Sequence, residues 1–92
     1  MNDVVPTGER LTVAAIGDGA ARESGPVVAS RAGGLALHLP GELPWSPGDG
    51  VFLVWHTDEQ DMIAVATFRR VVAEVALFEL LSPFRRYNRR AL

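Results

Sequence analysis

Turn-forming residues recur at short intervals along this chain and divide it into short apolar runs. Nine glycines and six prolines occur in 92 residues, and both residue types favour turns and interrupt helices and central strands. The intervening runs are rich in β-branched and large apolar residues, which is typical of strands. We predict strands at 11–16, 27–30, 35–39 and 51–55, with a loop at 41–50, GELPWSPGDG. This pattern predicts an all-β domain.

Residues 62–81 allow two interpretations. They are apolar nearly throughout, and Phe68, Val71, Val75 and Phe78 fall near helical spacing, which is compatible with one helix. The β-branched content and the regular turns upstream favour two strands that meet at Ala73 and Glu74. With two strands here the chain has six, which is typical of a small barrel or sandwich. We predict a six-stranded antiparallel barrel.

The size and composition of the chain predict one small cytoplasmic domain. Ninety-two residues, 48% of them hydrophobic, suffice for one modest core. The chain has no cysteine, so it forms no disulfide and no cysteine-based metal site. It has neither a signal-peptide pattern nor an apolar run long enough to span a bilayer, so we expect no membrane insertion. We expect a loose lead-in at 1–8, the barrel at 9–82 and a flexible basic tail at 83–92.

Charge is distributed unevenly along the chain. Residues 1–84 contain five arginines and eleven acidic residues, a net charge of −6, whereas residues 85–92 contain four arginines and no acid. An acidic body repels phosphates, so general nucleic-acid binding is not expected. The local candidate for anion binding is the terminal cluster Arg85, Arg86, Arg89 and Arg90. Guanidinium groups bind phosphate or the guanine edge through two parallel hydrogen bonds. The alternative is a solvated tail that binds nothing.

The other polar residues do not form a pattern typical of catalysis. His38 and His56 lie on or beside predicted strands with no ligand spacing around them, and we interpret both as structural histidines. No nucleophile elbow and no phosphate-binding glycine motif is present. We therefore expect no enzymatic activity, no metal and no tightly bound cofactor.

Two tryptophans have different expected environments. Trp55 lies in the apolar run 51–55 and is expected in the core, whereas Trp45 lies in the loop 41–50 and is expected to be exposed. An exposed tryptophan is a frequent anchor of protein interfaces. Trp45 therefore supports an alternative function, a protein-interaction barrel that binds a partner or self-associates and has no small-molecule ligand.

Three segments together resemble the PilZ superfamily: GGLALHLP at 33–40, PGDGVFL at 47–53 and RRYNRR at 85–90. The chain looks most like the N-terminal barrel of the flagellar-brake (YcgR-type) proteins, which leads through an Arg-x-x-x-Arg linker into a PilZ barrel. The resemblance implies a split-barrel fold and a regulatory role in bacterial cyclic di-GMP signalling, including control of motility. Its implied partners are cyclic di-GMP, a downstream PilZ barrel, and a motor or secretion protein.

The resemblance also implies site residues. Arg85 or Arg86, followed by Arg89 or Arg90, would clamp the ligand. Ser30 and Gly33 match the Ser and Gly of the Asp/Asn-x-Ser-x-x-Gly motif on the barrel, although the hydrogen-bonding first residue is replaced by Val28. The arginines follow the barrel here, whereas in a complete PilZ domain they precede it. Both departures are consistent with a domain that precedes a PilZ barrel, and a permuted or degenerate PilZ barrel is the alternative.

Overall fold

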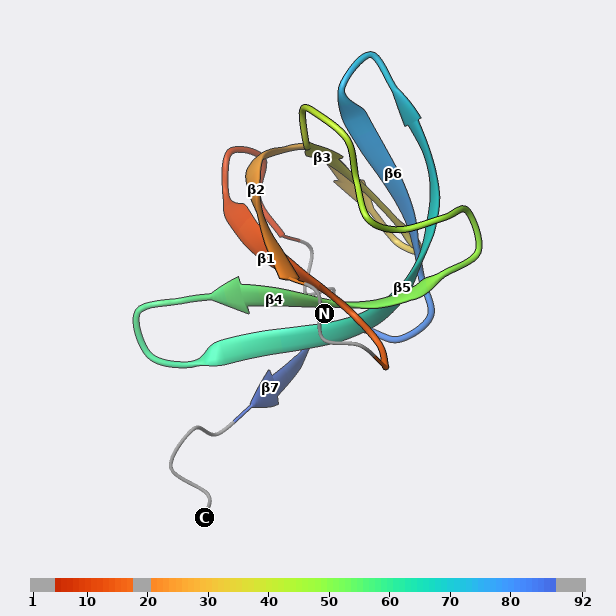
Figure 1. Cartoon of the computed structure of the whole chain (residues 1–92). Coiled ribbons are helices and arrows are strands. Elements are labelled where there is room, and N and C mark those ends of the chain that lie inside the picture. Colours follow the sequence, from red (N-terminus) through yellow and green to blue (C-terminus); the bar gives the residue numbers. More distant parts are fainter. Residues whose placement is uncertain (1–4, 18–20, 88–92) are drawn as a thin grey trace.

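The chain folds into a closed antiparallel β-barrel (Figure 1). The computed structural model describes residues 5–17 and 21–87. The strand order is β4-β1-β2-β3-β6-β5-β7, and pairing of β4 with β5 closes six of the strands into the predicted barrel. In the described residues there is no helix that has the length and apolar character to cross a membrane. The strands are β1 (Arg10–Ala15), β2 (Ala21–Arg31), β3 (Gly34–His38), β4 (Gly50–His56), β5 (Asp61–Val72), β6 (Val75–Leu80) and β7 (Arg85–Tyr87).

Strands β5 and β6 form a hairpin that confirms the two-strand interpretation of residues 62–81. Ala73 and Glu74 connect the strands and have φ angles of 51° and 67°. Two consecutive residues with positive φ match the right-handed twist of the strands that they connect. The helical alternative is wrong because apolar residues such as Ala76 and Phe78 alternate with more exposed ones, at the period of a strand.

Strand β2 begins at Ala21, earlier than the polar residues at its start suggested. Its pairing with β1 shifts register between Arg10 and Thr12, which identifies a bulge. At this irregularity the Leu11 N–H donates to the Ser24 hydroxyl oxygen at 3.0 Å, and Ser24 is buried. The sequence predicted this strand only at 27–30, because the residues before it are polar and Pro26 is expected at the start of a strand.

The loop between β3 and β4 covers the core with Trp45, so the expectation of an exposed Trp45 is wrong. The side chain is 5% exposed, and its ring centroid lies 6.0 Å from that of Phe68 and 6.4 Å from that of Phe78. Main-chain hydrogen bonds from Gly48 to Phe68 and from Phe68 to Asp49 hold the loop against β5. Trp45 therefore stabilises the fold and presents no exposed ring to a partner.

Both ends of the described chain take part in the fold. Val5, in the expected lead-in, is buried in the core. Phe84, in the expected basic tail, is 3% exposed, and β7 directly after it pairs with residues 61–63 of β5. Residues 84–87 therefore pack against or pair with the barrel. Arg89 and Arg90 lie outside the described residues.

Candidate functional site

A hollow of about 630 Å³ lies beside β7, within the size range of small-molecule sites. The side chains around it come from β4, from the β4–β5 connection, from β5, from the residue before β7 and from β7. Two are cationic, two are aromatic, two are neutral polar groups and one is a thioether. These residues are Trp55, Thr57, Gln60, Met62, Phe84, Arg85 and Arg86.

Strand pairing explains why the residues of this hollow, which are distant in sequence, lie together. Trp55 lies opposite Met62 across β4 and β5, and Met62 lies opposite Arg86 across β5 and β7. Residues paired across antiparallel strands present their side chains to the same face of a sheet. The three therefore form one row, with an aromatic ring at one end and a guanidinium group at the other.

The Trp55 ring is held by two contacts. Its indole N–H donates to Glu9 Oε1 at 2.9 Å. Its ring packs nearly perpendicular to that of Phe84, with centroids 6.3 Å apart and an interplanar angle of 85°. We expected Trp55 in the core, but it is partly buried and packs at the margin of the core, where it also lines the hollow.

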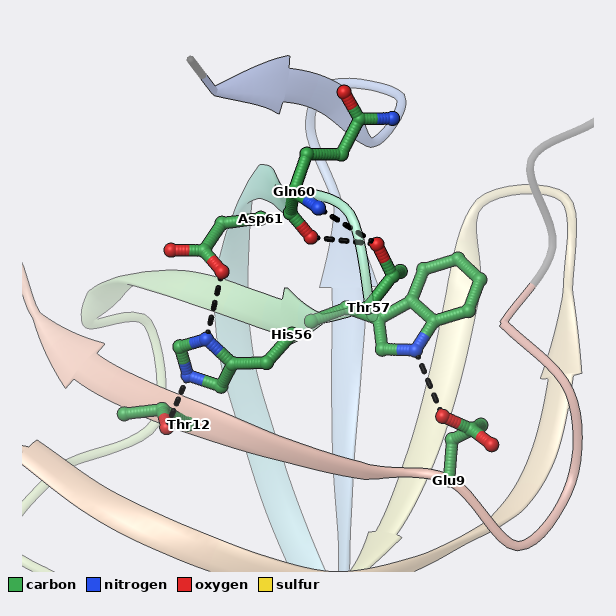
Figure 2. A network of polar contacts seen from close by, with 7 residues as sticks. Glu9, Thr12, His56, Thr57, Gln60 and Asp61 are labelled. Carbon is green, nitrogen blue, oxygen red and sulfur yellow. Dashed lines mark hydrogen bonds and ion pairs between the residues drawn. The ribbon is translucent and has the colours of Figure 1, made fainter. Parts of the chain in front are cut away.

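A polar network ties together the strands that carry the hollow. His56 lies between Thr12 and Asp61 in Figure 2. Its Nδ1 is 2.9 Å from Asp61 Oδ1, and its Nε2 is 3.2 Å from Thr12 Oγ1. The network therefore links β1, β4 and β5 through one imidazole ring, which agrees with a structural histidine.

The face of the sheet on which this network lies limits what it does. Thr12 alternates with the buried Leu11 and Val13, so its hydroxyl group points away from the core. A hydroxyl, an imidazole and a carboxylate in this order also occur in nucleophilic catalytic sites. Here, however, the outer network and the row that lines the hollow lie on opposite faces of β4. The network thus stabilises β4 and β5 from the face of the sheet opposite to the hollow.

The end of the β4–β5 hairpin is shaped by main-chain contacts. The Thr57 hydroxyl donates to the Gln60 carbonyl oxygen at 2.6 Å and accepts from the Gln60 N–H at 3.1 Å. Figure 2 shows that these contacts involve main-chain atoms of Gln60, while its side-chain amide extends away from them. The hairpin therefore presents the Gln60 amide beside the hollow on a fixed backbone.

The structure does not bring all of the predicted site residues together. Ser30 lines a second hollow, between β2, β3 and β6, together with Arg31 and Phe78. Gly33 lies in the β2–β3 turn with a φ angle of 84°, where its carbonyl oxygen accepts from the Leu80 N–H at 3.0 Å. No residue lines both this hollow and the one beside β7. Arg85 and Arg86 thus line one hollow and Ser30 lines another, while Gly33 lines neither of the two.

A third hollow provides an internal comparison. It is lined by Arg69 and Arg70 of β5 together with Pro47 and Gly48. This second arginine pair has no aromatic ring beside it in that lining, and Arg69 Nη1 lies 3.4 Å from Glu79 Oε1. An acidic neighbour competes with an anionic ligand for the same guanidinium group.

The site is interpreted from its own residues. Comparison with protein-family models, curated proteins and solved structures finds no match to this chain. Across residues 5–17 and 21–87, no three His, Asp or Glu side chains come together as a metal site. The sequence indicated a hairpin connection at 57–61, but not the register of the β4–β5 hairpin, which places Trp55 opposite Met62 and His56 opposite Asp61.

Proposed function

We propose that this chain is a non-enzymatic regulatory module that binds cyclic di-GMP, with Arg85 and Arg86 as the first contacts for its phosphates. The observation that carries the proposal is that both arginines line one hollow together with two aromatic rings. A guanidinium group donates two parallel hydrogen bonds to phosphate oxygens and keeps its charge at every physiological pH. The resemblance of the RRYNRR segment to the PilZ arginine motif supports the same ligand.

The position of β7 suggests how binding is transmitted. Phe84 anchors the chain immediately before β7, and the three residues of β7 pair only with the start of β5 among the described strands. A short edge strand has few hydrogen bonds to hold it, so contacts from a bound anion stabilise its docked state strongly. The proposed output is the direction in which the following chain leaves the barrel. A downstream PilZ barrel or a motor or secretion protein would respond to this direction.

The separation of the predicted site residues refines this proposal. Because Ser30 lines a different hollow from Arg85 and Arg86, we propose that the barrel contributes only the arginine half of the receptor. A second barrel supplies the remaining contacts, as in the two-barrel arrangement that the resemblance implies. The isolated chain is then expected to bind the dinucleotide weakly, and restoration of that second barrel strengthens binding.

Isothermal titration with cyclic di-GMP tests the proposal. A charge-assisted hydrogen bond contributes about 1.5–3 kcal/mol, so loss of both contacts in Arg85→Ala/Arg86→Ala weakens binding by at least about 100-fold. The matched control is Arg69→Ala/Arg70→Ala, which removes the same charge from a hollow that lacks aromatic rings. Equal losses in the two variants would indicate a nonspecific charge effect. Unchanged binding in the first variant would refute the proposed site.

A second candidate function is self-association through the outer face of β1 and β4. Phe52 and Ile16 are 39% and 47% exposed, and the two strands pair directly beside them, with Ala14 opposite Phe52. Exposed apolar side chains that lie together mark interaction surfaces. Light scattering coupled to size exclusion tests this candidate: a dimer that Phe52→Ser dissociates supports it, and a monomer at all concentrations refutes it.

A further inference from the structure

The hollow beside β7 contains an aromatic surface as well as cations, and its chemistry goes beyond anion capture. We infer that Trp55 is a stacking platform for one purine base, and that Arg86 holds the phosphate of the same nucleotide. The inference rests on the proposed function in one respect: both place the ligand in the hollow beside β7. Its new content is that one barrel holds a complete purine nucleotide unit, so that a mononucleotide is a sufficient ligand.

The first support is the fixed position of the indole ring. Glu9 holds its N–H, and the Phe84 ring packs nearly perpendicular to it. A ring that is already immobilised loses little conformational freedom when a base stacks on it, and this preorganisation favours binding. Trp55 is only partly buried, and it borders the hollow. Its remaining exposed surface is therefore directed at the place where a ligand would lie.

The second support is the spacing between this ring and the cations. Trp55, Met62 and Arg86 occupy successive strands in one cross-strand row, so about 9–10 Å separates the backbones at the two ends of the row. A long arginine side chain spans part of that distance. Met62 lies between them, 8% exposed, and its flexible, polarisable thioether side chain lines the middle of the hollow. The row therefore has the order of a nucleotide: base contact, apolar middle and phosphate contact.

The other tryptophan makes the inference measurable. Trp45 is buried between Phe68 and Phe78, whereas Trp55 borders the hollow. Quenching of the partly buried Trp55 indole by a stacked base therefore changes the Trp55 part of the emission and leaves the Trp45 part unchanged. A phosphate that binds without a base leaves both parts unchanged.

The experiment titrates the full chain with GMP, with ribose 5-phosphate and with cyclic di-GMP, followed by tryptophan fluorescence and calorimetry. Stacking of one base on an aromatic side chain strengthens binding by roughly 5- to 150-fold. We expect GMP to quench the emission and to bind more tightly than ribose 5-phosphate by a factor in this range. Trp55→Leu is expected to remove that difference while ribose 5-phosphate binding is unchanged.

Glu9 is a positioning residue in this account, and its variants provide a second test that leaves Trp55 in place. Glu9→Ala removes the acceptor of the indole N–H, and we expect it to weaken GMP binding. Glu9→Gln keeps an acceptor oxygen and is expected to restore it. Both changes remove one negative charge, which by itself favours phosphate binding. A loss in Glu9→Ala that Glu9→Gln reverses is therefore an effect of ring orientation.

The outcomes separate this inference from the proposed function. If Arg85→Ala/Arg86→Ala abolishes cyclic di-GMP binding but Trp55→Leu leaves it unchanged, the stacking inference is overturned and the arginine site stands. If GMP binds through Trp55 as tightly as cyclic di-GMP, the stacking inference stands and selectivity for the dinucleotide is refuted. If GMP neither quenches the emission nor binds more tightly than ribose 5-phosphate, the inference is overturned. If Trp55→Leu does not fold, the two Glu9 variants decide.

Discussion

Replacement of the β5–β6 turn by Asn-Gly is predicted to stabilise the barrel. Ala73 and Glu74 both have positive φ, and a non-glycine residue in this left-handed region costs roughly 1–2 kcal/mol. Glycine at position 74 removes this cost, although its greater freedom in the unfolded chain lowers the stability by roughly 0.5–1 kcal/mol. Asparagine tolerates the left-handed region and relieves part of the cost at position 73.

The same variant removes one exposed contact between His38 and Glu74, which reduces the gain slightly. Glu74 Oε1 lies 3.5 Å from His38 Nε2, with both side chains well exposed, and an exposed pair of this kind contributes roughly 0.2–1 kcal/mol. The hydrogen bond from the Leu39 N–H to the Glu74 carbonyl oxygen uses only main-chain atoms and is retained. The net expectation for Ala73→Asn/Glu74→Gly is a gain of about 1 kcal/mol, or roughly 4–8 °C in Tm for a small domain.

Reversible urea unfolding followed by circular dichroism measures this gain. The sign of the change is decisive, because the same two residues in the middle of a helix would destabilise it by about 1–1.5 kcal/mol. The matched control is Asp58→Asn/Glu59→Gly in the β4–β5 connection, where neither residue has positive φ. We expect no stabilisation there. A loss of stability in Ala73→Asn/Glu74→Gly would refute the turn geometry and the reasoning built on it.

Three further changes test the packing around the barrel. Trp45→Ala is expected to lower the free energy of unfolding by about 3–5 kcal/mol. Trp45→Phe is expected to lower it less, because this change keeps an aromatic ring and removes a buried indole N–H that has no partner among the described residues. Equal losses of the two variants in urea unfolding would contradict this. Ser24→Ala leaves the Leu11 N–H without its acceptor, at a cost of about 1–3 kcal/mol by the same assay, and a neutral result would refute the bulge contact. Phe84→Ala is expected to accelerate amide hydrogen exchange in β7 while β1 to β6 stay protected, and unchanged exchange would show that Phe84 does not anchor β7.

The fold class was predictable because local patterns determine most of this barrel. The turn between β5 and β6 falls at Ala73 and Glu74, as the residue pattern predicted. The β-branched content of the residues on either side favoured two strands that meet there. The run 51–55 was predicted correctly as a strand because it is a short, near-continuous apolar run that follows a turn-rich loop. Each of these elements follows from residues that are close in sequence, and local composition is enough to identify it.

The environment of Trp45 was not predictable from local composition. A loop with several prolines and glycines is expected at the surface, and most of this one is exposed. Its main-chain bonds to Phe68 nevertheless turn one side chain inward over the core. Only the distant partners Phe68 and Phe78 decide that this side chain is buried, and the loop sequence does not encode their positions.

The candidate site was only half predictable. The charge distribution identified Arg85 and Arg86, but the strand that positions them depends on pairing with residues 61–63, and a three-residue edge strand has too little pattern to be recognised. Trp55 looked like a core residue because its neighbours are apolar. Its contact with Glu9, 46 positions away in sequence, is a property of the closed barrel.

The most direct test of the central claim is an amide NMR titration of the isotopically labelled chain with cyclic di-GMP. The proposed site predicts that shifts concentrate at Gln60, Met62, Arg85 and Arg86 and at the indole N–H of Trp55, all of which border one hollow. Shifts concentrated at Ser30 and its neighbours would instead place the ligand in the hollow between β2, β3 and β6. That result, or the absence of any shift at saturating ligand, would contradict the account.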